Sequence, residues 1–138
     1  MVKKTLIIEY DYDFVLLGIS CHEKDYRLCH EINVALKAAF KKQDDLEITL
    51  SRQKETSAFS LYQYHNRDGC DFYVIANKGT KGFLIPEQKQ VDYFLVMKPA
   101  LHKEDKMDVL KKVKKIHCVL GTYEFNPEKL KSRQNLIF

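Results

Sequence analysis

The sequence predicts one α+β domain over residues 1–138, with a mainly antiparallel sheet of about six strands and two helices packed on one face of that sheet. The length of 138 residues is typical of a single domain. Hydrophobic residues make up 45% of the chain, with five glycines and three prolines, which excludes collagen-like and disordered chains. Short β-branched and aromatic segments outnumber the two segments with helical periodicity, which favours an antiparallel sheet.

The first third of the chain predicts a strand followed by a helix. Residues 5–20 are rich in β-branched and aromatic side chains, as strands are. Residues 25–41 are expected to be helical because apolar side chains recur there at spacings of three and four: Leu28, Ile32, Ala35, Leu36 and Ala39. Two N-terminal caps compete. Ser20 with Glu23 forms a capping box, but Asp25 would lie on the apolar stripe of a helix that began earlier, so we favour Asp25 as the N-cap.

The middle third predicts strands separated by turns. Apolar and polar residues alternate in 46–50 and in 59–64, and residues 71–76 are almost continuously apolar. Turn-forming residues lie at 66–69 and 77–82. A meander of antiparallel strands is therefore expected.

The last third predicts strands around one helix. Residues 83–85 and 91–97 are strand candidates divided by Pro86, which cannot donate a hydrogen bond to a ladder. A helix over about 105–117 has one apolar arc and lysines elsewhere. The chain is then expected to return as a strand over 118–125, before a tail with a short turn and an edge segment.

The compartment follows from what the sequence lacks. No segment approaches the ~20 apolar residues of a membrane-spanning helix, and acidic residues interrupt the apolar run near the N-terminus that a signal peptide would need. The four cysteines include no C-x-x-C pair and are expected to be reduced and mostly buried. The sequence therefore predicts a soluble cytoplasmic protein that does not contact a membrane.

No catalytic or metal-binding motif is complete. The segment from Gly18 through Ser20 lacks the second glycine of a nucleophile elbow. Cysteine is followed by histidine at Cys21 and again at Cys29, and both residue types bind zinc. On a helix, however, the side chains of Cys29 and His30 would point ~100° apart. We therefore predict no enzyme activity, no metal and no cofactor.

The net charge of +4 is concentrated near the C-terminus. Residues 1–102 carry 14 basic and 14 acidic side chains, whereas residues 103–138 carry nine basic and five acidic. Residues 9–31 hold six acids against two bases, so a dipolar molecule is expected if the two charged regions lie apart. The basic candidates for binding RNA phosphates or an acidic partner are Lys111, Lys112, Lys114, Lys115, Lys131 and Arg133. The competing interpretation of the helical lysines is a solvated helix surface.

Residues 85–93 read Ile-Pro-Glu-Gln-Lys-Gln-Val-Asp-Tyr and are called the motif segment below. This segment resembles the motif that names the IPExxxVDY family of uncharacterised bacterial proteins, and all six defining positions match. Residues 25–28 and 11–14 are also similar to that family. The resemblance implies membership and a bacterial source, and it implies no activity, cofactor or catalytic residue.

The motif segment supplies a candidate partner-binding rim made of Pro86, Glu87, Asp92 and Tyr93. In the competing interpretation, Pro86 and Glu87 shape a turn and Tyr93 is a core residue with a hydrogen-bonded hydroxyl. We expect a non-catalytic binding or scaffold protein that docks a protein partner or assembly. The alternative is an RNA-associated protein, of the ribosome or of RNA processing, that uses the basic C-terminal helix and tail. An enzyme acting at the motif segment comes third, and homo-oligomer formation stays open.

Overall fold

The structure is a computed structural model that describes residues 13–50 and 55–136. Positions 5–12 of the predicted first strand lie outside the described residues. Eight strands and two α-helices follow in the order β1 (Val15–Ser20), α1 (Asp25–Leu36), β2 (Lys41–Lys42), β3 (Leu46–Leu50), β4 (Glu55–Phe59), β5 (Leu61–His65), β6 (Asp71–Ala76), β7 (Tyr93–Lys98), α2 (Lys103–Lys114) and β8 (Gly121–Phe125). Three short 3₁₀ turns are η2 (Pro86–Gln88), η3 (Pro127–Lys129) and η4 (Arg133–Leu136).

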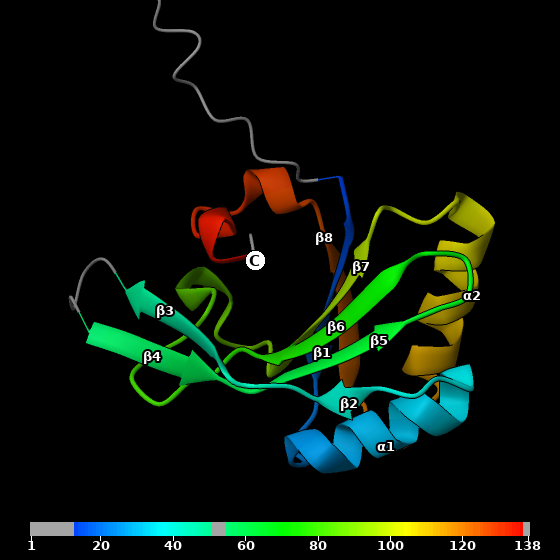
Figure 1. Cartoon of the computed structure of the whole chain (residues 1–138), viewed down its shortest axis with the longest axis horizontal. Helices are drawn as coiled ribbons and strands as arrows, with labels where there is room; N and C mark the ends of the chain where they lie inside the picture. The colour runs from blue at the N-terminus through cyan, green and yellow to red at the C-terminus, as the bar shows by residue number, and fades with distance from the viewer. Residues whose placement is uncertain (1–12, 51–54, 137–138) are drawn as a thin grey trace, which may run out of the picture.

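Six strands form one sheet in the order β2-β5-β6-β7-β1-β8, and every neighbouring pair is antiparallel. Strands β3 and β4 form a separate hairpin that projects away from α2 in Figure 1. Strand β1 lies between β7 and β8, so it pairs with segments far along the chain. The predicted α+β class with a mainly antiparallel sheet is confirmed.

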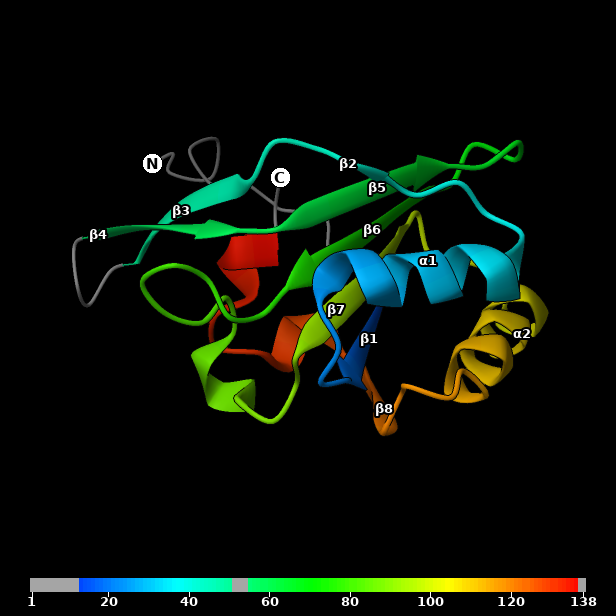
Figure 2. The same cartoon turned by 90° about the horizontal axis from the view of Figure 1, so that it is seen from below.

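Both helices pack on one face of the sheet, here called the helix face (Figure 2). Leu95 and Met97 of β7 are fully buried there, in a cluster with Leu28 and Ile32 of α1 and Val113 of α2. Successive residues of a strand point to opposite faces. A strand as apolar as β7 therefore requires a cover on its other face too.

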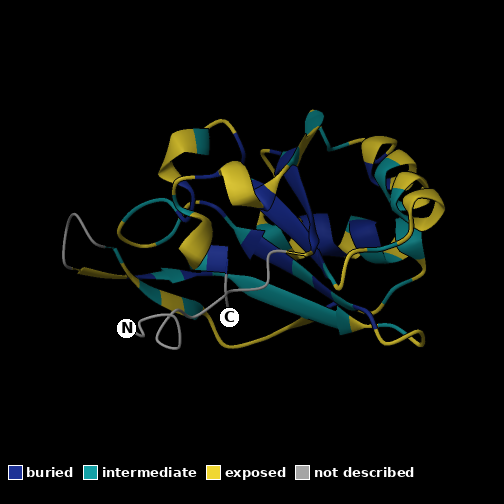
Figure 3. Cartoon of the chain, turned by 90° about the horizontal axis from the view of Figure 1, so that it is seen from above, coloured by how far each residue is buried: buried dark blue, intermediate teal, exposed yellow. Residues whose placement is uncertain are grey.

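On the opposite face, here called the loop face, the described residues form no α-helix. This face is covered by the hairpin, by residues 77–92 and by the tail with η3 and η4. Phe94 of β7 is fully buried against this cover, in a cluster that includes Leu84, Ile85, Val91, Leu130 and Leu136. Figure 3 shows the central strands as buried and the outward sides of the helices as exposed.

The prediction of a helix over residues 25–41 was too long at its C-terminal end. The helix ends at Leu36, and Lys37 has a left-handed backbone with φ 54°. The carbonyl of Asn33 accepts the Ala38 N–H at 3.0 Å, and its side-chain Oδ1 accepts the Phe40 N–H at 2.7 Å. Asparagine competes for backbone groups in this way, and the turn delivers Phe40 to the core of the helix face.

The prediction of Asp25 as the N-cap was wrong, although the helix does begin at Asp25. Lys24 holds the N-cap position and makes no side-chain capping bond. The Asp25 carboxylate instead accepts hydrogen bonds from the Ser60 hydroxyl and the Tyr26 N–H. The alternative capping box is not formed by Ser20 either, since its hydroxyl donates to the Gln90 carbonyl at 2.9 Å.

Several other elements have bounds that differ from those predicted. The predicted strand 59–64 is interrupted at Ser60, where the chain leaves the hairpin and enters the sheet as β5. Residues 83–85 are not a strand and make only an isolated bridge through Phe83 to Lys78. The second helix covers Lys103–Lys114, β8 begins at Gly121, and the tail forms 3₁₀ turns in place of an edge segment. No helix in the described ranges is long and apolar enough to cross a membrane.

Candidate functional site

The motif segment is organised by Asn77, which is fully buried at the end of β6. Its Oδ1 accepts the Ile85 N–H at 2.8 Å. Its Nδ2 donates to the carbonyls of Gln88 at 2.9 Å and Val91 at 2.8 Å. Buried polar groups need such partners, so one amide fixes the path of residues 85–91 without a strand. Pro86 then begins η2, a position that suits its fixed φ and missing N–H.

The four predicted rim residues lie in two separate environments. The exposed Pro86 and Glu87 lie beside the tail. The Asp92 Oδ2 accepts the Cys21 N–H at 2.8 Å, and the Tyr93 hydroxyl donates to the Glu23 carbonyl at 2.7 Å, so both brace the connection from β1 to α1. Tyr93 is buried with a hydrogen-bonded hydroxyl, as in the competing interpretation. Glu87, Asp92 and Tyr93 therefore do not converge as catalytic groups would.

Glu87 fastens the tail to the motif segment. Its carboxylate accepts the Ser132 N–H at 2.9 Å and the Ser132 hydroxyl at 2.8 Å. Partial burial acts to raise the pKa of Glu87, but the hydrogen bonds from Ser132, together with those from backbone N–H groups of Glu87 and Lys131, outweigh it, so the pKa lies below its ordinary value. The carboxylate is thus held in its charged form by the tail. Burial also raises the pKa of Tyr93, so its phenol is a neutral donor.

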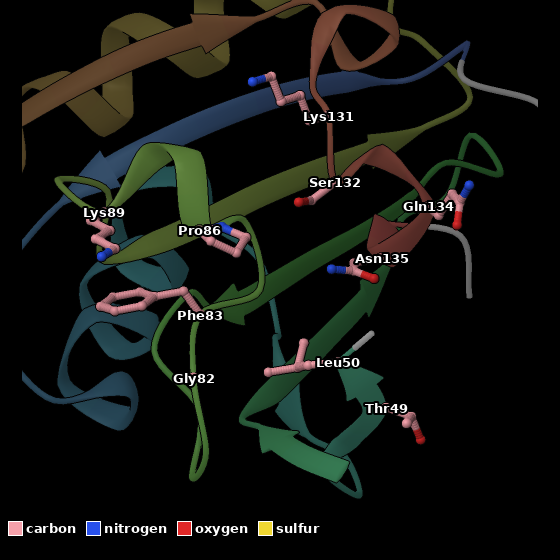
Figure 4. A pocket seen from close by; sticks show the side chains of 10 residues that line it. All are labelled: Thr49, Leu50, Gly82, Phe83, Pro86, Lys89, Lys131, Ser132, Gln134 and Asn135. Carbon is pink, nitrogen blue, oxygen red and sulfur yellow. The ribbon is translucent and has the colours of Figure 1, made fainter. Parts of the chain in front are cut away.

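A pocket of about 490 Å³ opens on the loop face beside Pro86, and we call it the motif pocket. Three stretches of the described chain contribute to it: the end of β3, residues 82–89 and the tail at 131–135. Figure 4 shows Lys89 beside the ring of Phe83, with the tail residues on another side. The Lys89 Nζ lies 5.8 Å from the centroid of that ring. The described residues that line the motif pocket are Thr49, Leu50, Gly82, Phe83, Pro86, Lys89, Lys131, Ser132, Gln134 and Asn135.

A second hollow, of about 290 Å³, lies between α2 and β8, and we call it the strand–helix groove. Buried Leu17 of β1 contributes to it, together with Met107, Leu110, Lys111, Lys114, Thr122 and Glu124. Thr122 and Glu124 pair with Ile19 and Leu17, so their side chains share the helix face with them. The Lys106 Nζ and a Glu124 carboxylate oxygen lie 2.8 Å apart and join α2 to β8.

The predicted basic residues are divided between the two faces. Lys111 and Lys114 line the strand–helix groove, and exposed Lys115 follows at the end of α2. Lys112 pairs with Asp108 at 2.9 Å. Lys131 lines the motif pocket, and Arg133 donates to the backbone carbonyls of Glu128 and Leu130, both on the loop face with the tail. The six residues therefore do not form one basic surface.

The acidic and basic regions adjoin one another in the described part of the chain. Helices α1 and α2 pack together on the helix face. The Glu31 Oε1 of α1 lies 4.0 Å from the His117 Nδ1 that follows α2. The condition for a dipolar molecule, that the two regions lie apart, is not met by these helices.

The cysteines behave as core residues. Cys21, Cys29 and Cys70 are buried on the helix face, and Cys118 is partly exposed. Burial raises the pKa of Cys21 to about 11, of Cys29 to about 12 and of Cys70 to about 11. Each thiol is therefore a poor nucleophile and a poor metal ligand at neutral pH. Within residues 13–50 and 55–136, no three histidine, cysteine or acidic side chains form a metal-binding group.

Sequence reasoning missed the strand–helix groove. Its apolar contributors Met107 and Leu110 lie on a helix of which only the lysines were noted as a candidate surface. Met107, Leu120 and Tyr123 are large apolar side chains with exposed fractions of 52%, 64% and 42%. An apolar residue on the lysine-rich side of a helix is a signal that pattern analysis could have used.

Comparison with known proteins gives no match to a family model, to a curated protein or to a solved structure. The resemblance of the motif segment to the IPExxxVDY family therefore stays a prediction. The case for function rests on the two hollows and their surroundings.

Proposed function

We propose that this chain is a non-catalytic binding protein that docks an extended segment of a protein partner as an added strand on the outer edge of β8, beside α2. The observation that carries the proposal is a sheet edge that no described strand covers, next to the strand–helix groove. Strand β8 is last in the sheet order, so among the described residues no strand pairs with its outer edge. Alternate N–H and C=O groups of an edge strand point outward and can bind another chain.

The opposite edge of the sheet, formed by β2, is protected against strand addition, whereas the β8 edge, in the described part of the chain, is not. Strand β2 is only two residues long and consists of the exposed Lys41 and Lys42. Short edges with lysine are a common protection against strand addition. Strand β8 has five residues and contains neither lysine nor proline. The outer edge of β3 also lacks a partner in the described chain, but β3 has no exposed large apolar side chain, and neither α1 nor α2 lies beside it (Figure 1).

The groove indicates which segment would bind. Met107 and Leu110 offer apolar contact to side chains on one face of an added strand. Tyr123 lies on the other face of β8, because it pairs with Gly18 between the helix-face positions. Lys111 and Lys114 favour acidic side chains. The expected partner segment is extended, with acidic and apolar residues in alternation.

The test is selection from a display library of short random peptides, followed by titration of a selected peptide. We expect enrichment of peptides with alternating acidic and β-branched or aromatic residues. N-methylation of alternate backbone amides in the selected peptide should abolish binding, because it removes the donors of the added ladder and leaves the side chains. Binding of the N-methylated peptide with unchanged affinity, or no enrichment at all, would contradict the proposal.

Matched charge variants locate the site. The double variant Lys111→Gln with Lys114→Gln is expected to bind the selected peptide with about tenfold lower affinity. This is the effect expected from removing two charges at the rim of a partly desolvated site. The control is Lys41→Gln with Lys42→Gln, which removes the same charge from the β2 edge and should leave the affinity unchanged. Equal losses in the two variants would show that only net charge matters.

RNA association is the second candidate, and the observation that favours it is the row of exposed lysines on α2, at 111, 112, 114 and 115. The affinity for a structured RNA should then fall steeply with salt concentration. Replacement of all four lysines by glutamine should flatten that dependence. No binding at low salt would remove this candidate.

A further inference from the structure

The motif pocket lies on the loop face, away from the strand–helix groove, so what it binds is independent of the function proposed above. Its volume of about 490 Å³ falls within the usual range of small-molecule sites. Its walls come from segments far apart in the sequence, and side-chain hydrogen bonds fix two of these walls, residues 82–89 and the tail, in place.

The fastening makes the pocket preformed. Buried Asn77 fixes residues 85–91 through three hydrogen bonds. On the tail, Ser132 is held by the Glu87 carboxylate, and the Asn135 Nδ2 donates to the Leu84 carbonyl at 2.7 Å. A pocket that needs no ordering on binding avoids the entropic cost that weakens flexible sites.

The lining combines apolar surface with positive charge. Leu50, Phe83 and Pro86 supply the apolar part, and Lys89 and Lys131 supply two ammonium groups. Among the described residues that line the pocket, none is an aspartate or a glutamate. The nearby Glu87 carboxylate is occupied by two hydrogen bonds from Ser132. Because these hydrogen bonds leave the charge of Glu87 in place, an anion would meet two cations of the lining against one nearby carboxylate, which is a net positive charge.

We propose that the motif pocket binds a small molecule that joins a flat apolar ring system to an anionic group. The ring system packs against Phe83 and Pro86, since aromatic and proline rings present flat apolar surfaces. The anion pairs with Lys89, which already lies over the Phe83 ring, and Lys131, on the tail side of the pocket in Figure 4, adds positive charge from farther away. A carboxylate and a phosphate share this chemistry, and the probes below separate them.

The probes are 2-naphthoate, 2-naphthyl phosphate, the neutral 2-naphthylmethanol and the cationic 2-naphthylmethylamine. Titrations followed by amide chemical shifts should give a Kd below about 1 mM for at least one anion, with the neutral alcohol about tenfold weaker and the amine weaker still. The shifts should map to residues 82–89 and 131–135. Tighter binding of the phosphate than of the carboxylate would assign the natural anion as a phosphate, and the reverse would assign a carboxylate.

Charge-matched variants test the pocket itself. The double variant Lys89→Gln with Lys131→Gln should bind both anions with about tenfold lower affinity, and its affinity for the neutral alcohol should be unchanged. Lys78→Gln with Lys81→Gln is the control, because these exposed lysines lie outside the pocket lining. Phe83→Leu should weaken all the naphthalene probes that bind. The proposal is overturned if neither anion binds, if the amine binds as well as the anions, if the shifts map elsewhere, or if the control pair weakens the anions equally.

Discussion

The two faces of the sheet share the same strands but are covered by different kinds of structure. On the helix face, α1 and α2 satisfy their own backbone hydrogen bonds and contribute apolar side chains such as Leu28 and Val113. On the loop face, residues 77–92 and the tail contribute Leu84, Ile85 and Leu136 from irregular backbone. That backbone needs other partners, and several of them are single side chains.

The difference shows where polar side chains decide the structure. On the loop face, Asn77, Glu87 and Asn135 each fasten a piece of the cover. On the helix face, Asn33 fastens the turn after α1, and Asp92 and Tyr93 brace the connection before it. The same contrast locates the two hollows: the strand–helix groove lies beside a regular helix, and the motif pocket lies between fastened loops. The predictions below test whether the loop face is packed as a true core.

The largest effect is expected from removing a central side chain on either face. Phe94→Ala should lower the free energy of unfolding by about 4 kcal/mol, and Leu95→Ala by about 3 kcal/mol, because both side chains are fully buried and leave cavities. Urea denaturation of the two variants measures the difference. A small loss of unfolding free energy for Phe94→Ala, with a large one for Leu95→Ala, would show that the loop face is packed more loosely than the helix face.

Asn77→Ala should lower the free energy of unfolding by about 2–3 kcal/mol, because it removes the partner of the Ile85 N–H and of the Val91 carbonyl and one of the two donors to the Gln88 carbonyl. Asn33→Ala is the matched control on the helix face and should cost about 1 kcal/mol, since Asn33 is only half-buried and water can replace it. Amide hydrogen exchange should show faster exchange at residues 85–91 in the first variant only. Equal costs would remove the distinction between the faces.

Gly18→Ala tests the packing of β1 against the loop face. A Cβ at Gly18 would lie 2.6 Å from a ring carbon of Phe125 and 2.9 Å from a methyl carbon of Val91. We expect a loss of about 2 kcal/mol from this overpacking, measured by urea denaturation. Gly121→Ala is the control, since its closest contact is the Tyr123 hydroxyl at 3.0 Å, at the end of an exposed side chain.

The smallest effect concerns Glu87 and is pH-dependent. Its pKa is lowered in the folded protein from the ordinary value of 4.5, so its contribution to stability is present above that pH and is lost as the pH falls through the lowered pKa. Glu87→Gln should therefore lower Tm slightly at neutral pH, by the equivalent of at most about 1 kcal/mol. The difference in Tm from the unchanged protein should shrink at acidic pH. A constant difference across the titration would contradict the assigned role of the carboxylate.

Periodicity allowed most of the regular structure to be predicted. Leu46–Leu50 and Asp71–Ala76 were predicted with their observed bounds, because alternation or a continuous apolar run reports directly on burial. The start of α1 at Asp25 was also correct. The end of the helix was predicted wrongly because Asn33 accepts hydrogen bonds from the Ala38 and Phe40 N–H groups and so stabilises a turn there. The spacing of apolar residues does not reveal such a turn.

The loop face could not be predicted in the same way. Residues 83–85 are as apolar as a strand, but the Ile85 N–H bonds to a side chain, and no strand of the described chain pairs with this segment. The motif pocket depends on the approach of the tail to Pro86 through Glu87 and Ser132. A contact between segments that are distant in the sequence produces no periodic pattern of residues. Pro86 was therefore identified as a candidate from the motif, whereas Phe83 and Lys89 of the same pocket were not.

The position of β1 in the sheet has a consequence for how the chain folds during synthesis. Leu17 pairs with Leu95 on one side and with Glu124 on the other, both far along the chain. Local contacts therefore cannot complete the centre of the sheet, and a high contact order slows folding. A ribosome must release almost the whole of the described chain before β1 gains both neighbours. Until then β1, with Leu16, Leu17 and Ile19, is an apolar strand that chaperones or other nascent chains can bind.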